Sequence, residues 1–325
     1  MRISALGCGT MGDPTAAVFA LGGHEVMLAG RDMAKSLAGR ERAFSALDLL
    51  ERSGIARREA IRDAKERLHP RDGLAEAAVG ADLVMESAPE DIEVKKAIYA
   101  VAERLVAPDV PILSNTSGLM PSVLAADMKH PERFVVTHFW NPPHLIPLVE
   151  VVPGPTTDRG LAPRIADILR SLGKKPVVLR REIAGFIGNR LQFALLREAF
   201  HIVETGAASM EDVDETVRNG IGRRFRDTGP FETADLGGLD VFLSISRYLF
   251  PDLSGNVTPP EALESAVAAG RLGAKTGGGL YDWSAESLAA VRESREATLV
   301  RCLDEDFGRG HPSTSSSTTS SGSRR

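Results

Sequence analysis

The sequence predicts an α/β domain with a parallel sheet, followed by a second domain made of helices. Three observations lead to this prediction. Short apolar runs alternate with helix-length segments through the first half of the chain, which is the pattern of βαβ units. A glycine-rich turn follows the first of these runs, at residues 7–12. Beyond Gly185, apolar residues recur at helical spacing and no convincing strand follows, which indicates helices.

Seven strands are expected in the first domain, each of them a short apolar run between helix-length segments or turn residues. They are Arg2–Leu6, Glu25–Ala29, Asp82–Ser87, Pro111–Asn115, Arg133–Phe139, Leu148–Val152 and Pro176–Leu179. Between the second and third strands the chain is polar and charged but keeps apolar residues at helical spacing. We therefore expect a protruding helical pair over about residues 33–67.

The chain is expected to form two domains and a tail. Its 325 residues suit two domains rather than one. We place the first domain at residues 1–183 and the helical second domain at 184–304, where Gly229-Pro230 marks a helix start with proline in the first turn. Residues 305–325 include a Ser/Thr-rich run and are expected to be disordered.

Composition excludes several classes of function. The net charge of −5 and the pI near 5.9 argue against a nucleic-acid-binding protein, which usually has a basic face. No apolar run has the length that spans a bilayer, and the N-terminus leads directly into the first strand, so we expect a cytoplasmic protein. Cys8 and Cys302 have neither a disulfide framework nor metal-ligand spacing, so no metal is expected.

The glycine-rich turn has the pattern of a dinucleotide-binding loop. Gly7-Cys8-Gly9-Thr10-Met11-Gly12 matches G-x-G-x-x-G between a strand and a helix. In that motif the first glycine makes a tight turn, the second lets the backbone approach the pyrophosphate, and the third lets the helix pack on the strand. A tight βα turn without a ligand is the alternative, and the surrounding βαβ unit disfavours it. A Rossmann-like domain is therefore expected.

The choice between NAD and NADP depends on the residue after the second strand. An acidic residue there normally binds the ribose of NAD. In this chain Gly30 and Arg31 stand at that point, followed by Asp32. A missing carboxylate beside a guanidinium favours the 2′-phosphate of NADP, whereas Asp32 reaching back would favour NAD. We expect NAD or NADP, with a slight preference for NADP.

A histidine and a glutamate on successive strands predict a proton-abstracting pair. His138 closes an apolar strand, and Glu150 lies within the next strand, after a short connection that contains proline. A carboxylate bonded to one ring nitrogen fixes the tautomer and raises the basicity of the other nitrogen. A buried, satisfied histidine and a surface glutamate explain the spacing equally well.

Several motifs together resemble the L-3-hydroxyacyl-CoA dehydrogenase family, over about residues 1–283. The motifs that carry the resemblance are Glu90–Lys95, Ser114-Asn115-Thr116-Ser117, His138–Pro142, Leu148–Glu150, Gly185–Arg190, Gly229–Glu232 and Lys275–Tyr281. The resemblance implies an oxidoreductase of fatty acid metabolism with a Rossmann-like domain and a helical domain that dimerises. We therefore expect a homodimer.

The resemblance also implies roles for matching residues. His138 resembles the base that takes the proton of the 3-hydroxyl, and Glu150 resembles the residue that orients it. Ser117 and Asn189 resemble the groups that hold the substrate oxygen. Glu90, Lys95 and Asn115 resemble cofactor-side residues. Without the resemblance, Ser117 is interpreted as a turn residue and Asn189 as an amide on a helix surface.

The substrate is open between two branches of this superfamily. Acyl-CoA members use the helical pair to help hold CoA, and here that pair carries the cations Arg57, Arg58, Arg62, Lys65 and Arg67. Their acidic neighbours are equally typical of a solvated helix face. Lambda-crystallin, L-gulonate dehydrogenase and carnitine dehydrogenase form a branch for small 3-hydroxy acids, and residues 141–150 and 189–193 resemble that branch.

The glycine-rich Lys275–Tyr281 motif resembles the acyl-CoA branch instead. We therefore expect a short-chain L-3-hydroxyacyl-CoA as the substrate, with a small hydroxy acid as the alternative. A rival from another class is a non-catalytic dinucleotide-binding or structural protein of the lambda-crystallin type. The joint presence of Ser117, His138, Glu150 and Asn189 argues against that rival.

Overall fold

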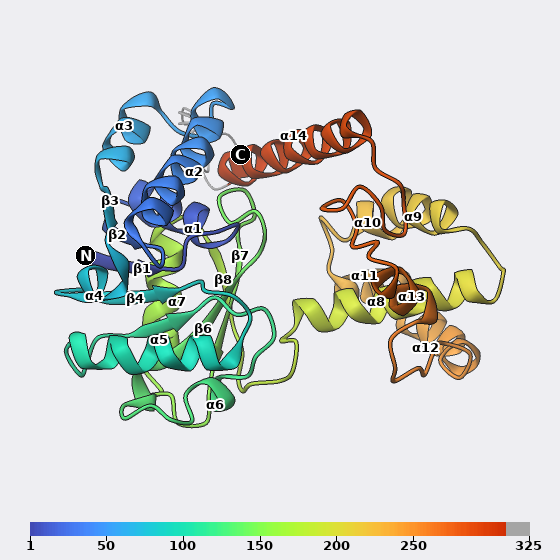
Figure 1. Cartoon of the computed structure of the whole chain (residues 1–325). Coiled ribbons are helices and arrows are strands. Elements are labelled where there is room, and N and C mark those ends of the chain that lie inside the picture. The colour runs from blue at the N-terminus through green and yellow to red at the C-terminus, as the bar shows by residue number, and fades with distance from the viewer. Residues whose placement is uncertain (310–325) are drawn as a thin grey trace, which may run out of the picture. The chain divides into compact units, whose positions relative to one another are not determined.

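The computed structural model describes residues 1–309, so the expected disorder of residues 310–325 lies outside the described part of the chain. Two compact units are present (Figure 1). The first comprises Met1–Phe186 together with residues 292–309, and the second is Ile187–Val291. An α/β unit and a helical unit are present, as the sequence predicts.

An eight-stranded sheet forms the centre of the first unit, in the order β3-β2-β1-β4-β5-β6-β7-β8. The strands are β1 Arg2–Leu6, β2 Glu25–Ala29, β3 Leu68–Arg71, β4 Leu83–Glu86, β5 Ile112–Ser114, β6 Phe134–Phe139, β7 Leu148–Pro153 and β8 Lys175–Val178. All pairs are parallel except β6 with β7. The seven predicted strands are confirmed to within one residue at each end.

Strand β3 was not predicted. Its sequence, Leu-His-Pro-Arg, has neither an apolar run nor a clear alternation. It lies at the edge of the sheet and pairs only with β2. A proline is tolerated at an edge because its missing N–H need not bond to a further strand.

Helices cover both faces of this sheet. They are α1 Gly12–Leu21, α2 Met33–Arg52, α3 Arg58–Glu66, α4 Gly73–Ala78, α5 Ile92–Leu105, α6 Pro121–Leu124, α7 Leu161–Ser171 and α14 Ala285–Arg309, with a 3₁₀ turn at Pro131–Arg133. One core cluster joins the sheet to α1, α2, α3, α7 and α14, and the other joins it to α4, α5 and α6. Helices α2 and α3 confirm the predicted helical pair.

Alternation along the strands supplies both clusters. Val26 and Leu28 of β2 belong to the first cluster, while Met27 and Ala29 belong to the second. All four side chains are almost completely buried. A parallel sheet covered on both faces buries successive side chains in this way. The carboxyl ends of its parallel strands share one edge, which is where ligands bind in such sheets.

The second unit consists of helices, as expected. They are α8 Gly188–Glu204, α9 Met210–Asn219, α10 Ile221–Arg224, α11 Pro230–Gly237, α12 Leu239–Leu249 and α13 Glu261–Ala268. Within residues 187–291 the extended pairings are isolated bridges near Gly278. The predicted helix start is confirmed, since α11 begins at Pro230 and the Gly229 N–H donates to the Glu232 carboxylate.

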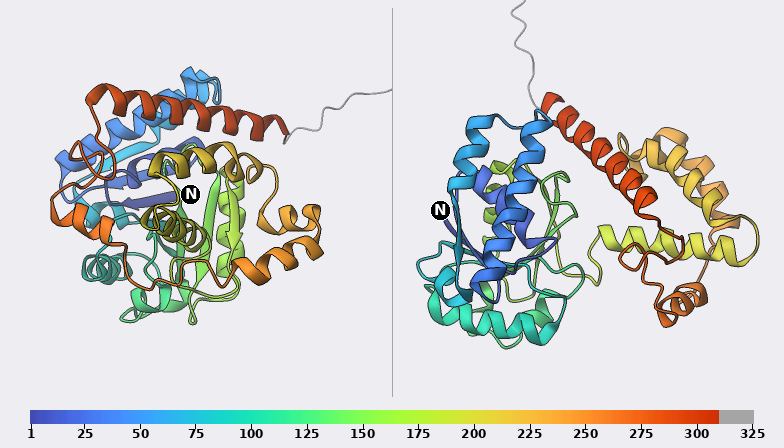
Figure 2. Two further views of the ribbon diagram at one scale, coloured as in Figure 1. Left: turned by 90° about the vertical axis from the view of Figure 1, so that its right-hand side faces the viewer. Right: turned by 45° about the horizontal axis from the view of Figure 1, so that its top comes forward.

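The last helix departs from the expected domain limits. Helix α14 continues to Arg309, so residues 305–309 are helical rather than disordered. From Arg292 onward it packs on the first unit, where Leu303 enters the core and the Lys175 ammonium lies 2.8 Å from the Asp306 carboxylate. Figure 2 shows this part of α14 beside α2 in both views. The sequence did not reveal this packing because α14 carries few apolar residues and no motif that specifies a partner.

Candidate active site

His138 and Glu150 lie opposite each other on the antiparallel pair β6 and β7. Their side chains meet, with His138 Nδ1 2.9 Å from Glu150 Oε2. Both are almost completely buried, at 5% and 1% exposure. The proline-containing connection between the strands fixes this register, and the predicted proximity is confirmed. A buried carboxylate bonded to Nδ1 orients the imidazole and leaves Nε2 available for a proton.

Two aromatic rings border the histidine. The Trp140 ring centroid lies 5.4 Å from that of His138, and the Phe186 centroid lies 5.6 Å from it. Trp140 Nε1 also donates to Glu150 Oε2 over 3.3 Å. Phe186 is completely buried with a positive φ of 52°, a backbone region that bulky residues rarely adopt. Such strain persists where the surroundings hold it, and here it places Phe186 against His138.

The segment after β5 brings Asn115 and Ser117 to the same edge of the sheet. Asn115 Oδ1 accepts from the Phe139 N–H over 2.9 Å, and Asn115 Nδ2 donates to Ser87 Oγ over 3.3 Å. Asn115 therefore links the end of β6 to the turn after β4. The Ser117 N–H donates to Glu90 Oε1 over 3.0 Å, and the Ser117 residue is exposed. Glu90 thus holds the backbone that presents this hydroxyl.

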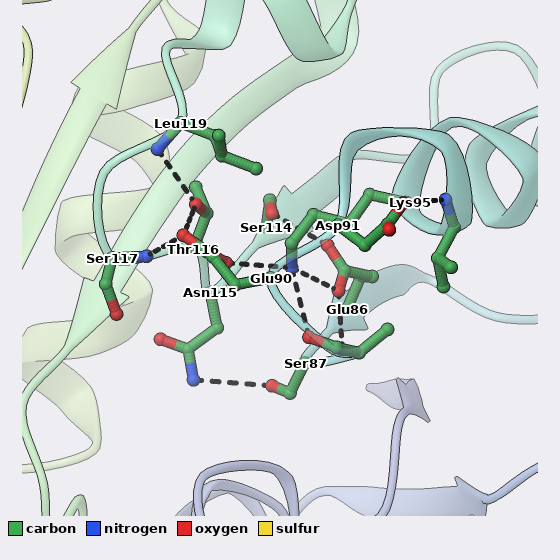
Figure 3. Close-up of polar contacts among 12 residues, drawn as sticks. Glu86, Ser87, Glu90, Asp91, Lys95, Ser114, Asn115, Thr116, Ser117 and Leu119 are labelled. Atoms are coloured by element: carbon green, nitrogen blue, oxygen red, sulfur yellow. Dashed lines mark hydrogen bonds and ion pairs between the residues drawn. The ribbon is translucent and has the colours of Figure 1, made fainter. Parts of the chain in front are cut away.

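A buried charged cluster lies beneath the turn that follows β4 (Figure 3). Glu86 is completely buried and accepts from the Lys95 ammonium, the Ala88 N–H and the hydroxyls of Tyr99 and Ser114. Four donors satisfy both carboxylate oxygens, and Lys95 balances the charge, as a buried ion requires. Burial, and then the Glu86 charge, raise the pKa of Tyr99, which therefore stays protonated. Neither Glu86 nor Tyr99 was expected in the site, and Ser114 was expected only as part of the family motif, with no role of its own.

Lys95 occupies a different place from the one expected of a cofactor contact. Its side chain is completely buried, and the ammonium donates to Glu86 and to the Ala88 carbonyl. Glu90 Oε2 lies 3.6 Å away. Through these contacts the Lys95 ammonium holds the Ser87–Pro89 turn in place. Its contribution to the site is support of that turn rather than contact with a ligand.

The glycine loop packs directly on the same turn. A Cβ at Gly7 would lie 2.6 Å from the Ser87 carbonyl group, and Gly7 has φ +108°. A Cβ at Gly12 would lie 1.8 Å from the Gly7 oxygen, so α1 approaches β1 only because the third glycine has no side chain. A Cβ at Gly9 would meet nothing within 4 Å. The second glycine therefore faces open space where a phosphate can approach.

A cavity of about 650 Å³ lies beside this loop at the carboxyl ends of β1, β2 and β4. Its lining residues are Leu6, Gly7, Cys8, Ala29, Gly30, Arg31, Lys35, Leu74, Ser87, Ala88, Pro89, Val94 and Ile98. Volume, apolar walls and a glycine turn fit the adenosine part of a dinucleotide. Thr10 and Met11 form the turn that leads into α1. Among the predicted cofactor residues, Gly7, Gly30 and Arg31 line the cavity.

Asn189 lies in the second unit, in the first turn of α8, and is half-buried. The other three expected catalytic residues lie in the first unit. Among residues 1–309, no group of three His, Cys, Asp or Glu side chains is arranged to hold a metal ion. Within the same range no helix is long and apolar enough to cross a membrane.

Two family models match the chain. The model described as "3-hydroxyacyl-CoA dehydrogenase, NAD binding domain" matches residues 2–183. The model described as "3-hydroxyacyl-CoA dehydrogenase, C-terminal domain" matches residues 185–283. Helix α14 lies beyond both matches.

Individual proteins from both substrate branches are similar to the chain. The 5-formyl-3-hydroxy-2-methylpyridine 4-carboxylate 5-dehydrogenase of Mesorhizobium japonicum is 36% identical, covering 92% of this chain and 96% of that protein. The L-carnitine dehydrogenase of Oceanobacillus iheyensis is 36% identical, over 73% of this chain and 76% of that protein. A 3-hydroxyacyl-CoA dehydrogenase of Gibberella moniliformis is 32% identical, over 91% of this chain and 87% of that protein.

A solved structure is also similar over nearly the whole chain. It is a 5-formyl-3-hydroxy-2-methylpyridine 4-carboxylic acid 5-dehydrogenase, described as an NAD⁺-dependent dismutase. The TM-score is 0.87 at 34% identity, with 95% of this chain and 99% of the other covered.

Proposed function

Because the chain belongs to the 3-hydroxyacyl-CoA dehydrogenase family of NAD-dependent oxidoreductases, we propose that it oxidises the hydroxyl-bearing carbon of a small carboxylate substrate. The observation that carries the proposal is the buried His138–Glu150 hydrogen bond of 2.9 Å. It supplies an oriented base at the sheet edge that also holds the glycine loop.

Proton and hydride leave the substrate by separate routes. His138 Nδ1–H donates to Glu150, so Nε2 has the free lone pair and takes the hydroxyl proton. A bound nicotinamide supplies the hydride acceptor. The carbon loses its hydride as the oxygen loses its proton, and a carbonyl results. Ser117 and Asn189 are proposed to donate to the oxygen through this change, and Glu150 stabilises the imidazolium.

A small acid now replaces acyl-CoA as our preferred substrate. The Mesorhizobium japonicum relative, whose name specifies a pyridine carboxylate, aligns with this chain over 96% of the relative's length. In α3 and its flanks, three of the five expected CoA-binding cations are paired with acids. These pairs are Arg58–Glu51, Arg62–Asp63 and Lys65–Asp48. Paired cations have less charge to offer to the phosphates of CoA.

An L-3-hydroxyacyl-CoA is the second candidate. The family description and the Gibberella moniliformis relative at 32% identity support it. The two candidates differ in one physical respect, since a CoA ester brings a nucleotide that needs its own cationic surface. The acyl-CoA candidate therefore predicts that Arg57 and Arg67, which flank α3, contribute to substrate affinity.

A substrate panel tests the proposal. The full-length protein is given NAD⁺ or NADP⁺ with L-carnitine, L-gulonate, 3-hydroxybutyrate or a formylpyridine carboxylate, whose formyl carbon bears a hydroxyl once it is hydrated. In reverse it is given acetoacetyl-CoA with the reduced cofactor. Absorbance of the reduced nicotinamide is followed. We expect kcat/KM for at least one small acid to exceed that for the CoA ester. Turnover confined to the CoA ester contradicts the proposal. Dinucleotide binding without any turnover supports the non-catalytic rival.

We also propose that the protein is a homodimer formed through the second unit. Helix α12 exposes Leu239, Phe242 and Leu243, at 62%, 41% and 54%. Spacings of three and four residues place these side chains on one face of the helix, and soluble monomers rarely expose an apolar patch of this kind. Sedimentation at increasing concentration should give a dimer. Leu243→Asp should shift it to monomer, whereas Val79→Asp, a matched change of an exposed residue in the first unit, should not.

We also propose a cytoplasmic location for the protein. Both cysteines are free, which supports this proposal.

A further inference from the structure

The end of β2 carries no ribose-binding carboxylate. In dinucleotide-binding folds an acid at this point hydrogen-bonds the 2′-hydroxyl of NAD, and an arginine nearby accommodates the 2′-phosphate of NADP. Here β2 ends at Ala29, and Gly30 and Arg31 precede α2. Both residues line the 650 Å³ cavity.

Position 30 has no room for a side chain. A Cβ there would lie 2.6 Å from the Lys35 Cβ and 3.2 Å from the Lys35 carbonyl carbon. The Gly30 N–H donates to Ser36 Oγ over 2.9 Å, and Ser36 is completely buried. The first turn of α2 therefore sits against Gly30 and excludes the acid that NAD recognition uses.

The two neighbouring acids, Asp32 and Asp72, accept hydrogen bonds from the backbone at the start of α2. Asp32 Oδ1 accepts from the Lys35 N–H over 2.8 Å as the helix N-cap, a contact that stabilises the start of α2. Asp32 Oδ2 lies 3.7 Å from the Arg31 guanidinium. Asp72 Oδ1 accepts from the Met33 N–H over 2.9 Å. Neither Asp32 nor Asp72 lines the cavity.

The charged groups that do line the cavity are cations. They are Arg31 and Lys35, and no lining residue is acidic. The Arg31 side chain is 82% exposed, and its ion pair with Asp32 spans 3.7 Å at the surface, longer than the 2.5–3.0 Å pairs of α3. It can therefore turn from Asp32 towards a ligand without leaving a packed position. A guanidinium binds phosphate through two parallel hydrogen bonds, and an ammonium adds a point charge.

We propose that Arg31 and Lys35 form a subsite for the 2′-phosphate of NADP(H), and that the protein prefers NADP(H) to NAD(H). The inference deepens the proposed function, because it rests on dinucleotide binding by the first unit. It does not depend on the substrate or on the chemistry at His138. Salt should weaken the preference, since both cations are near solvent.

Adenosine fragments test this subsite without catalysis. Calorimetry of the full-length protein with adenosine 2′,5′-bisphosphate and with 5′-AMP compares ligands that differ in the 2′-phosphate alone. We expect the bisphosphate to bind about 10- to 100-fold more tightly, as charge-assisted hydrogen bonds predict. Arg31→Gln and Lys35→Gln should each lower that ratio and leave 5′-AMP affinity unchanged. Arg170→Gln removes an exposed arginine of α7 that is paired with Asp167 and should leave the ratio unchanged.

Two results would overturn the proposal. One is equal affinity for the two fragments. The other is a loss of affinity for both fragments alike in Arg31→Gln, which would assign Arg31 to the adenine ring rather than to a phosphate. If both fragments bind as proposed but no substrate turns over, the subsite stands and the proposed function fails. Gly30→Asp is not a suitable variant, because the Cβ would clash with α2.

Discussion

The two compact units differ in how they treat charged and apolar side chains. The first, residues 1–186 with 292–309, buries the ionisable groups of Asp13, Glu86, Lys95, His138 and Glu150. In the second, residues 187–291, no charged side chain is buried, and Phe200 is the only buried apolar one.

The difference indicates a division of labour. Burial in the first unit lets the sheet hold charges at fixed distances, which a proton-transferring site requires. In the second unit Phe231 is 89% exposed and Val257 is 96% exposed, so much of the apolar surface of this unit faces solvent. Such a surface is suited to cover by another chain. Four predictions test this contrast, from the largest expected effect to the smallest.

Removing the base of the first unit should have the largest effect. His138→Gln keeps a polar side chain at the end of β6 but removes the basic nitrogen. We expect kcat to fall by about 10²- to 10⁴-fold, the usual contribution of a general base, with dinucleotide affinity unchanged. His130→Gln is the matched control, since the His130 side chain is 44% exposed and lies beside Glu132. Turnover near the wild-type rate in His138→Gln would refute the assignment.

Equivalent truncations should destabilise the two units unequally. Phe19 of α1 is completely buried, and Phe19→Ala should lower the free energy of unfolding by about 3–5 kcal/mol. Phe231→Ala removes the same atoms from an 89% exposed position and should cost less than ~0.5 kcal/mol in dilute protein. Urea denaturation at low concentration measures both. Equal losses would mean that the exposed surface of the second unit is buried in the isolated chain.

The second unit should contribute to catalysis through one residue. Asn189→Ala removes the amide proposed to hold the substrate oxygen, and we expect kcat/KM to fall by about 10- to 100-fold, as loss of one hydrogen bond to a developing charge predicts. Gln192→Ala, an exposed amide on the same helix, is the control. An unchanged kcat/KM in Asn189→Ala would confine the chemistry to the first unit.

Buried charge in the first unit should make stability depend on pH. Burial lowers the pKa of Lys174 to about 8, and its ammonium donates to the Pro143 and Ile146 carbonyls. The unfolded chain keeps that proton up to a higher pH, so folding releases it between about pH 8 and the ordinary lysine value of about 10.4. Lys174 should therefore contribute a rise of stability with pH across this window, with a slope of up to ~1.4 kcal/mol per pH unit, which the raised pKa of the Cys8 thiol opposes above about pH 9.

Denaturant titrations at several pH values check this slope. Lys174→Met should remove the rise, because no proton is then released. Lys275→Met, a change at an exposed lysine of the second unit, should leave it intact. A rise that persists in Lys174→Met would assign the pH dependence to another group.

The predictable part of the site follows from short-range rules. His138 and Glu150 are separated by a short connection with proline, and an antiparallel pair places such residues face to face. The glycine loop is likewise local, since strand, turn and helix are consecutive. These features could be recognised because few residues specify each of them.

The part that the sequence left undetermined depends on packing between distant elements. Glu86, Lys95 and Ser114 come from β4, α5 and the end of β5. Each is unremarkable alone, and only the folded chain reveals that Lys95 is completely buried against Glu86 rather than turned to a ligand. The same holds for Phe186, whose positive φ of 52° depends on its surroundings.

By itself, the sequence determined the element types apart from β3 and the end of α14, the order of the two units, the dinucleotide loop and the His138–Glu150 pair, because periodicity and adjacent turns specify them locally. The tertiary structure alone decided which charges are buried, that α14 returns to the first unit, and that Gly30 cannot carry a side chain. These properties depend on contacts between residues far apart in the chain, and no local pattern encodes them.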